Sequence, residues 1–404
     1  MKKTNISALL LAALLLIQLL CAPVSAVTAE PAADAQADAQ TASDNSAGDA
    51  AAEADSVPED QLLSSREQFS VAAKAALLID LNTNRVVYEQ DADERVYPAS
   101  LTKIMTCLIA LENGNLSDVV TVSESALADL DEDSSVAGLV VGEQMTLENL
   151  LYCMMVVSGN DACNVIAEHV AGSVTDFVRM MNQRAYELGC TNTHFNNPHG
   201  LHDESHYTTA RDLAIITQAA LKSENFRQIV DTYEYKLPDD NMRQNIPKLK
   251  TTNMLIYQSM SNSLYYPRAH GIKTGYTSQA GRCVISEATG DGLDLLGIVC
   301  GAATTVLDSG DLLMENFTEC ARLFDYGFDN YSYLTLMSPL YPVDQVKINN
   351  SAGAEAVAVA PQDEIKVLLP NDYDPDKLVT DIQLNSDSVD APVREGDVLG
   401  SATV

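Results

Sequence analysis

The spacing of apolar residues divides the chain into strand-like and helix-like stretches. Residues 75–80 form an apolar run, and residues 85–88 form a second one after an Asn-Thr-Asn turn, so we predict a β-hairpin. From Pro98 onward, apolar residues recur every three to four positions, which predicts a helix that begins near Ser100. Helical spacing then dominates residues 147–221.

Strand patterns return after this helical region. Residues 282–288 and 294–300 are predicted to pair as a second hairpin, and residues 312–324 to form a helix. From about Tyr333 the chain consists of short alternating segments rich in Val, Pro, Asp and Asn, which predict a small all-β domain. Strands on both sides of a helical insertion predict an α+β fold, in which an antiparallel sheet meets a helical cluster.

The first 66 residues differ in composition from the rest. Two lysines, an apolar run over residues 6–20 and small residues up to Ala26 predict a secretory signal peptide over residues 1–26. An uncleaved N-terminal anchor is the alternative. Residues 27–65 contain many Asp and Glu but no Lys or Arg, so residues 27–66 are predicted to be a disordered, acidic, Ala-rich linker. We therefore expect an exported protein.

Charge and cysteine content exclude some functions. The formal net charge of −33 over 404 residues argues against nucleic acid as a partner, because phosphate binding needs a basic face. The eight cysteines do not have the spacing of a compact disulfide framework, and we expect buried free thiols. No Cys/His cluster has the spacing of zinc ligands, so we expect neither a metal nor a cofactor.

Three short motifs carry the candidate chemistry, and the first opens the predicted helix at Ser100-Leu101-Thr102-Lys103. Ser100 and Lys103 are three residues apart and share one helix face. Serine is a poor nucleophile without a base. Lys103 can be that base only if burial or a nearby cation, such as Lys273, lowers its pKa. We predict that Ser100 is an acyl-ester nucleophile and Lys103 its general base.

The second motif, Ser158-Gly159-Asn160, follows an apolar run over residues 154–157. Polar residues directly after a buried segment are placed to line a cleft. We predict that Ser158 relays a proton and that Asn160 binds a substrate amide. The same pattern also occurs at residues 43–45 in the acidic segment, so a single match is weak evidence.

The third motif, Lys273-Thr274-Gly275, is predicted to lie on a strand at the edge of the cleft. Lys273 and Thr274 offer a positive charge and a hydroxyl group to a substrate carboxylate. Gly275 lets the substrate backbone approach closely because it has no side chain. The backbone N–H groups of Ser100 and Tyr276 are the predicted oxyanion hole.

The histidines allow two other schemes, because four of the six crowd one loop region. They are His194, His199, His202 and His206. A Ser/His/Asp triad is one alternative, although no Gly-x-Ser-x-Gly sequence is present, and a metal site is the other. We expect instead that His199 and His206 shape a loop that supports the cleft.

With their flanking residues, the motifs resemble the low-molecular-mass penicillin-binding proteins that act as serine-type D-alanyl-D-alanine carboxypeptidases. The resemblance extends from about residue 67 to the C-terminus. It is carried by residues 98–105, 158–162, 197–201, 206–212 and 271–277.

This resemblance implies a β-lactamase/transpeptidase-like catalytic domain over residues 67–332 and a β-rich domain over residues 333–404. It also implies that Ser100 attacks the penultimate carbonyl of a peptidoglycan stem pentapeptide and releases the terminal D-Ala. Water then hydrolyses the acyl-enzyme. β-Lactam antibiotics are expected to acylate Ser100 and remain bound. The expected location is the cell wall or the outer face of the cytoplasmic membrane.

The sequence departs from this family in two places. Family members often carry a basic residue that holds the substrate carboxylate, but residues 302–318 contain no Lys or Arg. Lys273 with Thr274, a contribution from Arg282, and a weaker carboxylate site are the alternatives. The family also usually ends in an amphipathic anchor, whereas this chain stops at Val404. A truncated C-terminus predicts association with the membrane surface, and a natural one predicts a released protein.

Other activities share the three motifs. A class A-like β-lactamase needs an added glutamate, and no Glu-x-x-Leu-Asn sequence is present. A D,D-endopeptidase and a transpeptidase remain alternatives. A catalytically silent wall-binding protein is disfavoured, because a pure binder does not need a nucleophile and a base.

Overall fold

The computed structural model describes residues 25–27, 69–128, 130, 134–259, 261–306 and 312–403. Apart from residues 25–27, the predicted signal peptide and acidic linker lie outside the described residues. The chain divides into two compact units, Glu67–Ser332 and a second unit that contains Tyr333–Val404. Each unit is described by itself.

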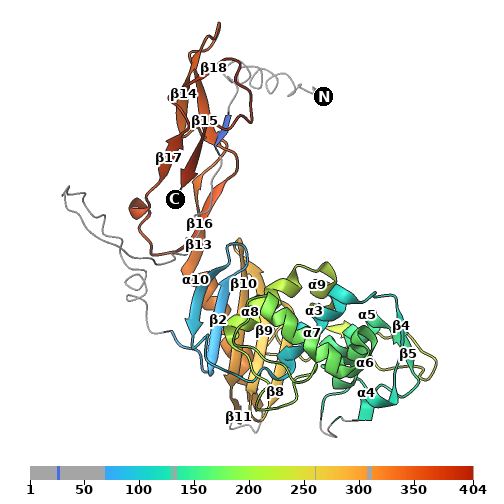
Figure 1. Ribbon diagram of the computed structural model, residues 1–404. Coiled ribbons are helices and arrows are strands. Elements are labelled where there is room, and N and C mark those ends of the chain that lie inside the picture. The colour runs from blue at the N-terminus through green and yellow to red at the C-terminus, as the bar shows by residue number, and fades with distance from the viewer. Residues whose placement is uncertain are drawn as a thin grey trace, which may run out of the picture. The chain divides into compact units, whose positions relative to one another are not determined.

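A five-stranded antiparallel sheet is the centre of the larger unit (Figure 1). Its strand order is β3-β2-β10-β9-β8, so β8 is an edge strand. The strands are β2 (Ala75–Asp80), β3 (Arg85–Gln90), β8 (Ala269–Thr277), β9 (Gly281–Gly290) and β10 (Leu293–Ala302). Both predicted hairpins are therefore present, β2 with β3 and β9 with β10.

The two faces of the sheet are covered by different helices. Leu77 on β2 and Ile298 on β10 belong to the large core that the helical cluster shares with the sheet. On the other face, a Cβ atom on Gly297 would lie 2.9 Å from the Phe324 ring of α10 (Glu315–Asn330). Burial on both faces explains why β2 appears in the sequence as a continuous apolar run rather than an alternating one.

The helical cluster is inserted between β3 and β8 and lies together on one side of the sheet in Figure 1. Its helices are α3 (Lys103–Asn113), α4 (Glu124–Ala128), α5 (Leu147–Val156), α6 (Asn160–Ala171), α7 (Val174–Glu187), α8 (Ala210–Leu221) and α9 (Glu224–Val230). Side-chain caps begin several of them, because Ser and Thr oxygens accept bonds from unpaired N–H groups of the first turn. The capping residues are Thr146, Ser173, Thr209 and Ser223.

Short hairpins complete this unit. They are β4 (Val119–Thr121) with β5 (Gln144–Thr146), β6 (Glu234–Tyr235) with β7 (Leu249–Lys250), and β11 (Thr304–Val306) with β12 (Leu312–Met314). The helix expected from residue 312 begins three residues later, because residues 312–314 pair with β11 instead.

The smaller unit consists of short strands. They are β13 (Tyr331–Met337), β14 (Asp344–Asn349), β15 (Ala356–Pro361), β16 (Ile365–Pro370), β17 (Asp381–Leu384), β18 (Ser388–Asp390) and β19 (Gly400–Thr403), with a 3-10 turn over Pro375–Lys377. β1 (Ser25–Val27) pairs in parallel with β15. Val346, Val357 and Val359 lie in its small apolar core.

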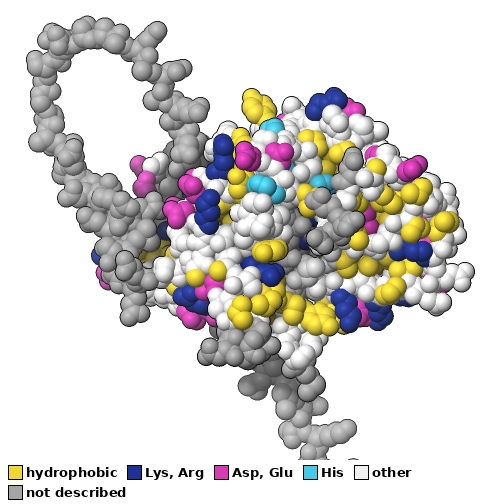
Figure 2. Space-filling model, turned by 90° about the horizontal axis from the view of Figure 1, so that it is seen from below, with side chains coloured by type: hydrophobic (Ala, Val, Ile, Leu, Met, Phe, Trp, Pro, Cys, Tyr) yellow, Lys and Arg dark blue, Asp and Glu magenta, His cyan; other side chains and the backbone are white. Residues whose placement is uncertain are grey.

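Surface charge is mixed on the face shown in Figure 2, where Lys and Arg side chains are scattered among acidic and apolar ones. Within the described part of the chain, no helix has both the length and the apolar content that a membrane crossing requires. The predicted α+β class is confirmed, with a β-rich region after the five-stranded sheet and its helices.

Candidate active site

The first motif begins in a 3-10 turn, Ala99–Thr102, that leads directly into α3. Lys103 Nζ donates a hydrogen bond to Ser100 Oγ at 2.9 Å. It also donates to Asn160 Oδ1 at 2.7 Å and to the His199 carbonyl at 2.8 Å. Lys103 is fully buried, and its three donors are therefore directed at three fixed acceptors.

Burial lowers the pKa of Lys103 to about 8, while the neighbouring Cys163 and Asp161 act in the opposite direction. The sequence left burial and the charge of Lys273 open as causes, and burial is the dominant one. At pH 7 a group with such a pKa is neutral in about one molecule in ten. Lys103 can thus accept a proton at neutral pH.

The second and third motifs meet at one hydrogen bond. Lys273 Nζ on β8 donates to Ser158 Oγ at 3.0 Å and to the Thr274 carbonyl at 2.9 Å. Ser158 has a φ of 63°, a backbone conformation that few residues other than glycine adopt, in the turn between α5 and α6. Burial and then the charge of Lys103 hold the pKa of Lys273 well below its ordinary value.

The edge strand β8 passes close to the nucleophile. A Cβ atom on Gly275 would lie 3.0 Å from Ser100 N, so the space beside this N–H exists only because Gly275 has no side chain. Thr274 Oγ1 and Thr252 Oγ1 are 2.6 Å apart and share a hydrogen bond. Strand β8 therefore brings the Thr274 hydroxyl group and a bare backbone to the cleft beside Ser100.

These residues line a cleft of about 510 Å³. Its walls include Ser100, Ser158, Asn160, Thr274, Gly275 and Tyr276, together with Ser134, Ser135, Gly200, Leu201, Thr252, Thr277, Arg282, Met314, Asn316 and Phe317. Lys103 and Lys273 lie buried behind this surface. The structure thus gathers all eight residues predicted from the three motifs at one place.

Arg282 brings a further cation to the cleft. Its Nε donates to Thr304 Oγ1 at 2.8 Å, and its guanidinium carbon lies 4.6 Å from the centre of the Tyr276 ring. Among the described residues, no carboxylate forms an ion pair with it. Arg282 lies on β9 directly opposite Tyr276 on β8, and this pairing carries its side chain to the cleft.

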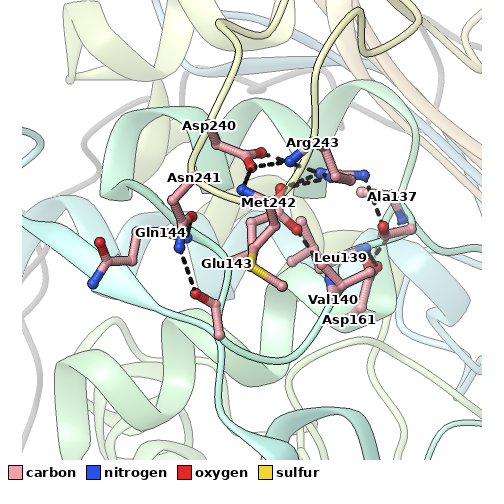
Figure 3. Close-up of polar contacts among 12 residues, drawn as sticks. Ala137, Leu139, Val140, Glu143, Gln144, Asp161, Asp240, Asn241, Met242 and Arg243 are labelled. Carbon is pink, nitrogen blue, oxygen red and sulfur yellow. Dashed lines mark hydrogen bonds and ion pairs between the residues drawn. The ribbon is translucent and has the colours of Figure 1, made fainter.

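The opposite wall is a loop over residues 134–143, which the sequence motifs did not predict. The Asn160 N–H donates to the Ser135 carbonyl at 2.8 Å. The Asp161 carboxylate accepts the N–H groups of Ala137 and Leu139 at 2.9 and 3.0 Å (Figure 3). The residue after Asn160 therefore attaches this wall to the beginning of α6.

The same loop is held from its other side by Arg243 (Figure 3). Arg243 Nε donates to Glu143 Oε1 at 2.8 Å, and Nη1 donates to the Gly138 carbonyl at 2.7 Å. Glu143 is fully buried and accepts the Val140 N–H at 2.9 Å. Burial, followed by a contact with Asp240, raises the pKa of Glu143 to about 6. A lone Glu and a lone Arg a hundred residues apart gave no signal in the sequence.

The loop that contains the predicted histidines contacts the first motif at Thr102 and Lys103. The His199 carbonyl accepts from Lys103, and the Pro198 carbonyl accepts from Thr106 Oγ1 at 2.6 Å. His206 Nε2 lies 2.8 Å from Thr102 Oγ1 rather than against Ser100.

Among the described residues, no group of three or more His, Cys, Asp or Glu side chains could hold a metal ion. The seven described cysteines are free and buried.

A serine hydroxyl bonded to a buried lysine, beside a second serine–lysine pair, defines a serine acyl-transfer enzyme. The family model for D-alanyl-D-alanine carboxypeptidase matches residues 62–304. The chain belongs to this family of serine hydrolases, as the resemblance predicted.

Relatives agree with this assignment. The D-alanyl-D-alanine carboxypeptidase DacF of Bacillus subtilis is 34% identical over 337 residues, which cover 81% of this chain and 80% of the relative. DacC of Escherichia coli, another D-alanyl-D-alanine carboxypeptidase, is 30% identical over 348 residues, which cover 82% of this chain and 80% of the relative.

Solved structures show the same fold. Penicillin binding protein 5 of Haemophilus influenzae matches with a TM-score of 0.62 at 28% identity, over 83% of this chain and 93% of that chain. The Streptomyces K15 DD-transpeptidase matches with a TM-score of 0.58 at 29% identity, over 65% of this chain and 100% of that chain. The fold is therefore the β-lactamase/transpeptidase-like fold that the resemblance implied.

Proposed function

We propose that this enzyme removes the terminal D-Ala from peptidoglycan stem pentapeptides through an acyl-enzyme on Ser100. The observation that carries the proposal is the 2.9 Å hydrogen bond between Lys103 Nζ and Ser100 Oγ, at a lysine whose pKa is about 8. Neutral Lys103 takes the proton as Ser100 Oγ attacks the penultimate carbonyl carbon. The N–H groups of Ser100 and Tyr276 stabilise the resulting oxyanion.

Ser158 and Asn160 complete the acylation step. Ser158 Oγ, bonded to Lys273, relays to the leaving D-Ala nitrogen the proton that Lys103 took from Ser100, so that the peptide C–N bond breaks as the ester forms and Ser158 ends unchanged. Asn160 Oδ1 is occupied by Lys103, which leaves the Asn160 amide N–H groups to bind a substrate carbonyl. Water then attacks the ester and releases the tetrapeptide and free Ser100. A β-lactam acylates the same hydroxyl group.

For the substrate carboxylate, we favour Arg282 together with Thr274. The pKa of Lys273 is held well below its ordinary value, so Lys273 is a poor permanent cation. Arg282 stays charged, lines the same cleft and has no ion-pair partner among the described residues. A carboxypeptidase must recognise a free carboxylate, and this guanidinium can bind one in two-point fashion.

Release of D-Ala from a synthetic pentapeptide tests the activity, and fluorescent penicillin labelling tests the acyl-enzyme. Wild type is expected to do both and Ser100→Ala neither. Labelling of Ser100→Ala would exclude Ser100 as the nucleophile. Adding an amine acceptor separates hydrolysis from transpeptidation, because only a transpeptidase forms the new amide product.

The carboxylate site has its own test. Arg282→Gln is expected to raise KM for the pentapeptide about 10- to 100-fold, as for loss of a charged hydrogen bond. KM for the same peptide with a C-terminal amide should not change. Arg268→Gln is a matched control, because Arg268 pairs with Asp291 and does not line the cleft. An unchanged pentapeptide KM in Arg282→Gln would favour Lys273 with Thr274.

We also propose that the enzyme is exported and acts on the cell wall outside the cytoplasm, with residues 1–26 as its leader and residues 27–66 as a linker. The basis is the Lys-Lys and apolar pattern followed by the acidic, Ala-rich composition. Mass spectrometry of the secreted protein should give an N-terminus near Val27, and limited proteolysis should cut between residues 27 and 65. An intact Met1 would indicate an uncleaved anchor.

A further inference from the structure

We infer that His206 and Thr102 are positioning residues that orient the oxyanion-hole N–H of Ser100 through the Ala99 carbonyl. The inference rests on the proposed function, because it assigns a role in the same acyl transfer. It concerns neither the nucleophile nor the base, and it gives a specific role to His206, which the sequence placed only in a loop that supports the cleft.

A directed chain of hydrogen bonds leads to the Ala99 carbonyl. The Asn196 N–H donates to His206 Nδ1 at 3.1 Å, so in the neutral ring the proton lies on Nε2. Nε2 is 2.8 Å from Thr102 Oγ1 and donates to it. The Thr102 hydroxyl then donates to the Ala99 carbonyl at 2.8 Å. Each donor and acceptor in this chain is used in a single consistent direction.

The geometry of the peptide bond transmits this orientation to Ser100. The Ala99 carbonyl and the Ser100 N–H belong to one planar trans peptide unit, so they point in opposite directions. Fixing the carbonyl oxygen on the Thr102 side fixes the N–H on the other side. Gly275 passes on that other side, because a Cβ atom built on Gly275 would lie 3.0 Å from Ser100 N. The fixed N–H therefore faces the cleft.

This peptide unit needs support. Ala99 has a φ of 48°, a left-handed conformation that a residue with a Cβ atom rarely adopts. A Cβ atom on Gly200 would lie 1.8 Å from the Ala99 oxygen, so the chain at Gly200 presses against the same carbonyl. Thr102 and Gly200 together hold a peptide orientation that the local sequence does not favour.

The surroundings keep His206 neutral. Its ring is buried, lies edge-on to Phe195 at 5.5 Å, and is approached by Asp203, His194, His202 and Lys103. Burial, more than any of these charges, lowers the pKa of His206 to about 4. A neutral ring bonded to Thr102, and not to Ser100, is suited to positioning rather than to the Ser/His/Asp triad considered from the sequence.

Two pairs of matched variants test the inference. Thr102→Ser keeps the hydroxyl group, and Thr102→Val removes it while keeping the shape. His206→Gln can place an N–H near the position of Nε2, whereas the shorter side chain of His206→Asn cannot reach Thr102. His202→Asn is the control in the same loop, because His202 is exposed and lies edge-on to the Tyr97 ring.

The readout separates the oxyanion hole from binding. Thr102→Val and His206→Asn are expected to slow both acylation by benzylpenicillin and hydrolysis of the penicilloyl-enzyme by about 10- to 100-fold, less than the complete loss of one oxyanion donor. The dissociation constant of the initial complex should change by less than about threefold, since the oxyanion forms only in the transition state. Thr102→Ser, His206→Gln and His202→Asn should stay near wild type.

Other outcomes overturn the inference. Wild-type rates in Thr102→Val, or His206→Gln as slow as His206→Asn, would show that the chain does not act through the hydroxyl and Nε2–H. If Thr102→Val or His206→Asn fails to fold, the conservative variants still test the inference. Acylation about 10- to 100-fold slower than wild type in Thr102→Ser and His206→Gln would contradict it. Failure of the proposed function is distinguishable, because then the wild-type enzyme itself would not be acylated.

Discussion

Lys273 Nζ donates a hydrogen bond to Ser158 Oγ at 3.0 Å, although 115 residues separate them along the chain. The bond joins the edge strand β8 to the turn between α5 and α6, and both residues are buried. A hydroxyl group held by a buried lysine can exchange protons without contact with bulk water. The second and third motifs therefore act as one unit.

Removing the hydroxyl group from this unit should stop proton transfer to the leaving group. Ser158→Ala is expected to lower kcat for D-Ala release by about 100- to 10,000-fold, the range for a lost general acid. KM should change little, because Asn160 and Arg282 remain. Steady-state kinetics with the pentapeptide check this. A kcat within threefold of wild type would mean that another group protonates the leaving nitrogen.

The pKa of Lys103 predicts the pH dependence of acylation. Only the neutral amine can accept the Ser100 proton, so the rate of penicillin labelling should rise with pH through about 8 and then level off. Lys103→Arg keeps the charge but cannot lose its proton, and labelling should fall about 100- to 10,000-fold. Stopped-flow labelling from about pH 6 to 10 measures both. Normal kinetics in Lys103→Arg would rule out Lys103 as the base.

Gly200 supports the nucleophile turn through close backbone contact. In Gly200→Ala, the new Cβ atom would lie 1.8 Å from the Ala99 oxygen at a φ of +90°, so the two backbones must separate. Backbone strain at one residue costs about 1–3 kcal/mol, and here the steric overlap with Ala99 adds to it. We therefore expect the free energy of unfolding to fall by more than that amount and acylation to become slower. Urea denaturation and penicillin labelling measure the two effects.

Gly172 provides the matched control for that change. It also has a positive φ, of +78°, but no described residue beyond its immediate chain neighbours lies within 4 Å of the position of its Cβ atom. Gly172→Ala should therefore cost only about 1 kcal/mol of backbone strain and leave acylation unchanged. Equal effects of the two substitutions would mean that strain, not contact with Ala99, determines the result at Gly200.

The buried Glu143 and Arg243 hold the 134–143 wall of the cleft. Arg243→Met leaves the Glu143 carboxylate buried without its cation, and we expect a loss of about 3–5 kcal/mol in the free energy of unfolding. Replacing both Glu143 and Arg243 by Met should be less destabilising than Arg243→Met alone, because the Glu143 carboxylate is then no longer buried without its cation; Asp240, which also faces Arg243, is present in both variants. Urea denaturation of the single and double variants measures this. Additive losses would show that the pair does not interact.

Most of the fold could be predicted from local patterns. The apolar runs at residues 75–80 and 294–300 identified strands, and helical spacing identified the insertion between the hairpins. The start of α10 was predicted three residues early, because pairing of residues 312–314 with β11 competes with helix formation and periodicity does not report it.

The sequence by itself determined the class of enzyme and the candidate residues for its chemistry, because Ser100, Lys103, Ser158 and Lys273 lie in short motifs whose residue types and order are characteristic. Only the tertiary structure decided which contacts make that chemistry work. Burial, which depends on the whole fold, lowers the pKa of Lys103. The site is supported by single contacts between distant segments, such as His206 with Thr102 and Arg243 with Glu143, and such contacts leave no periodic trace in a sequence.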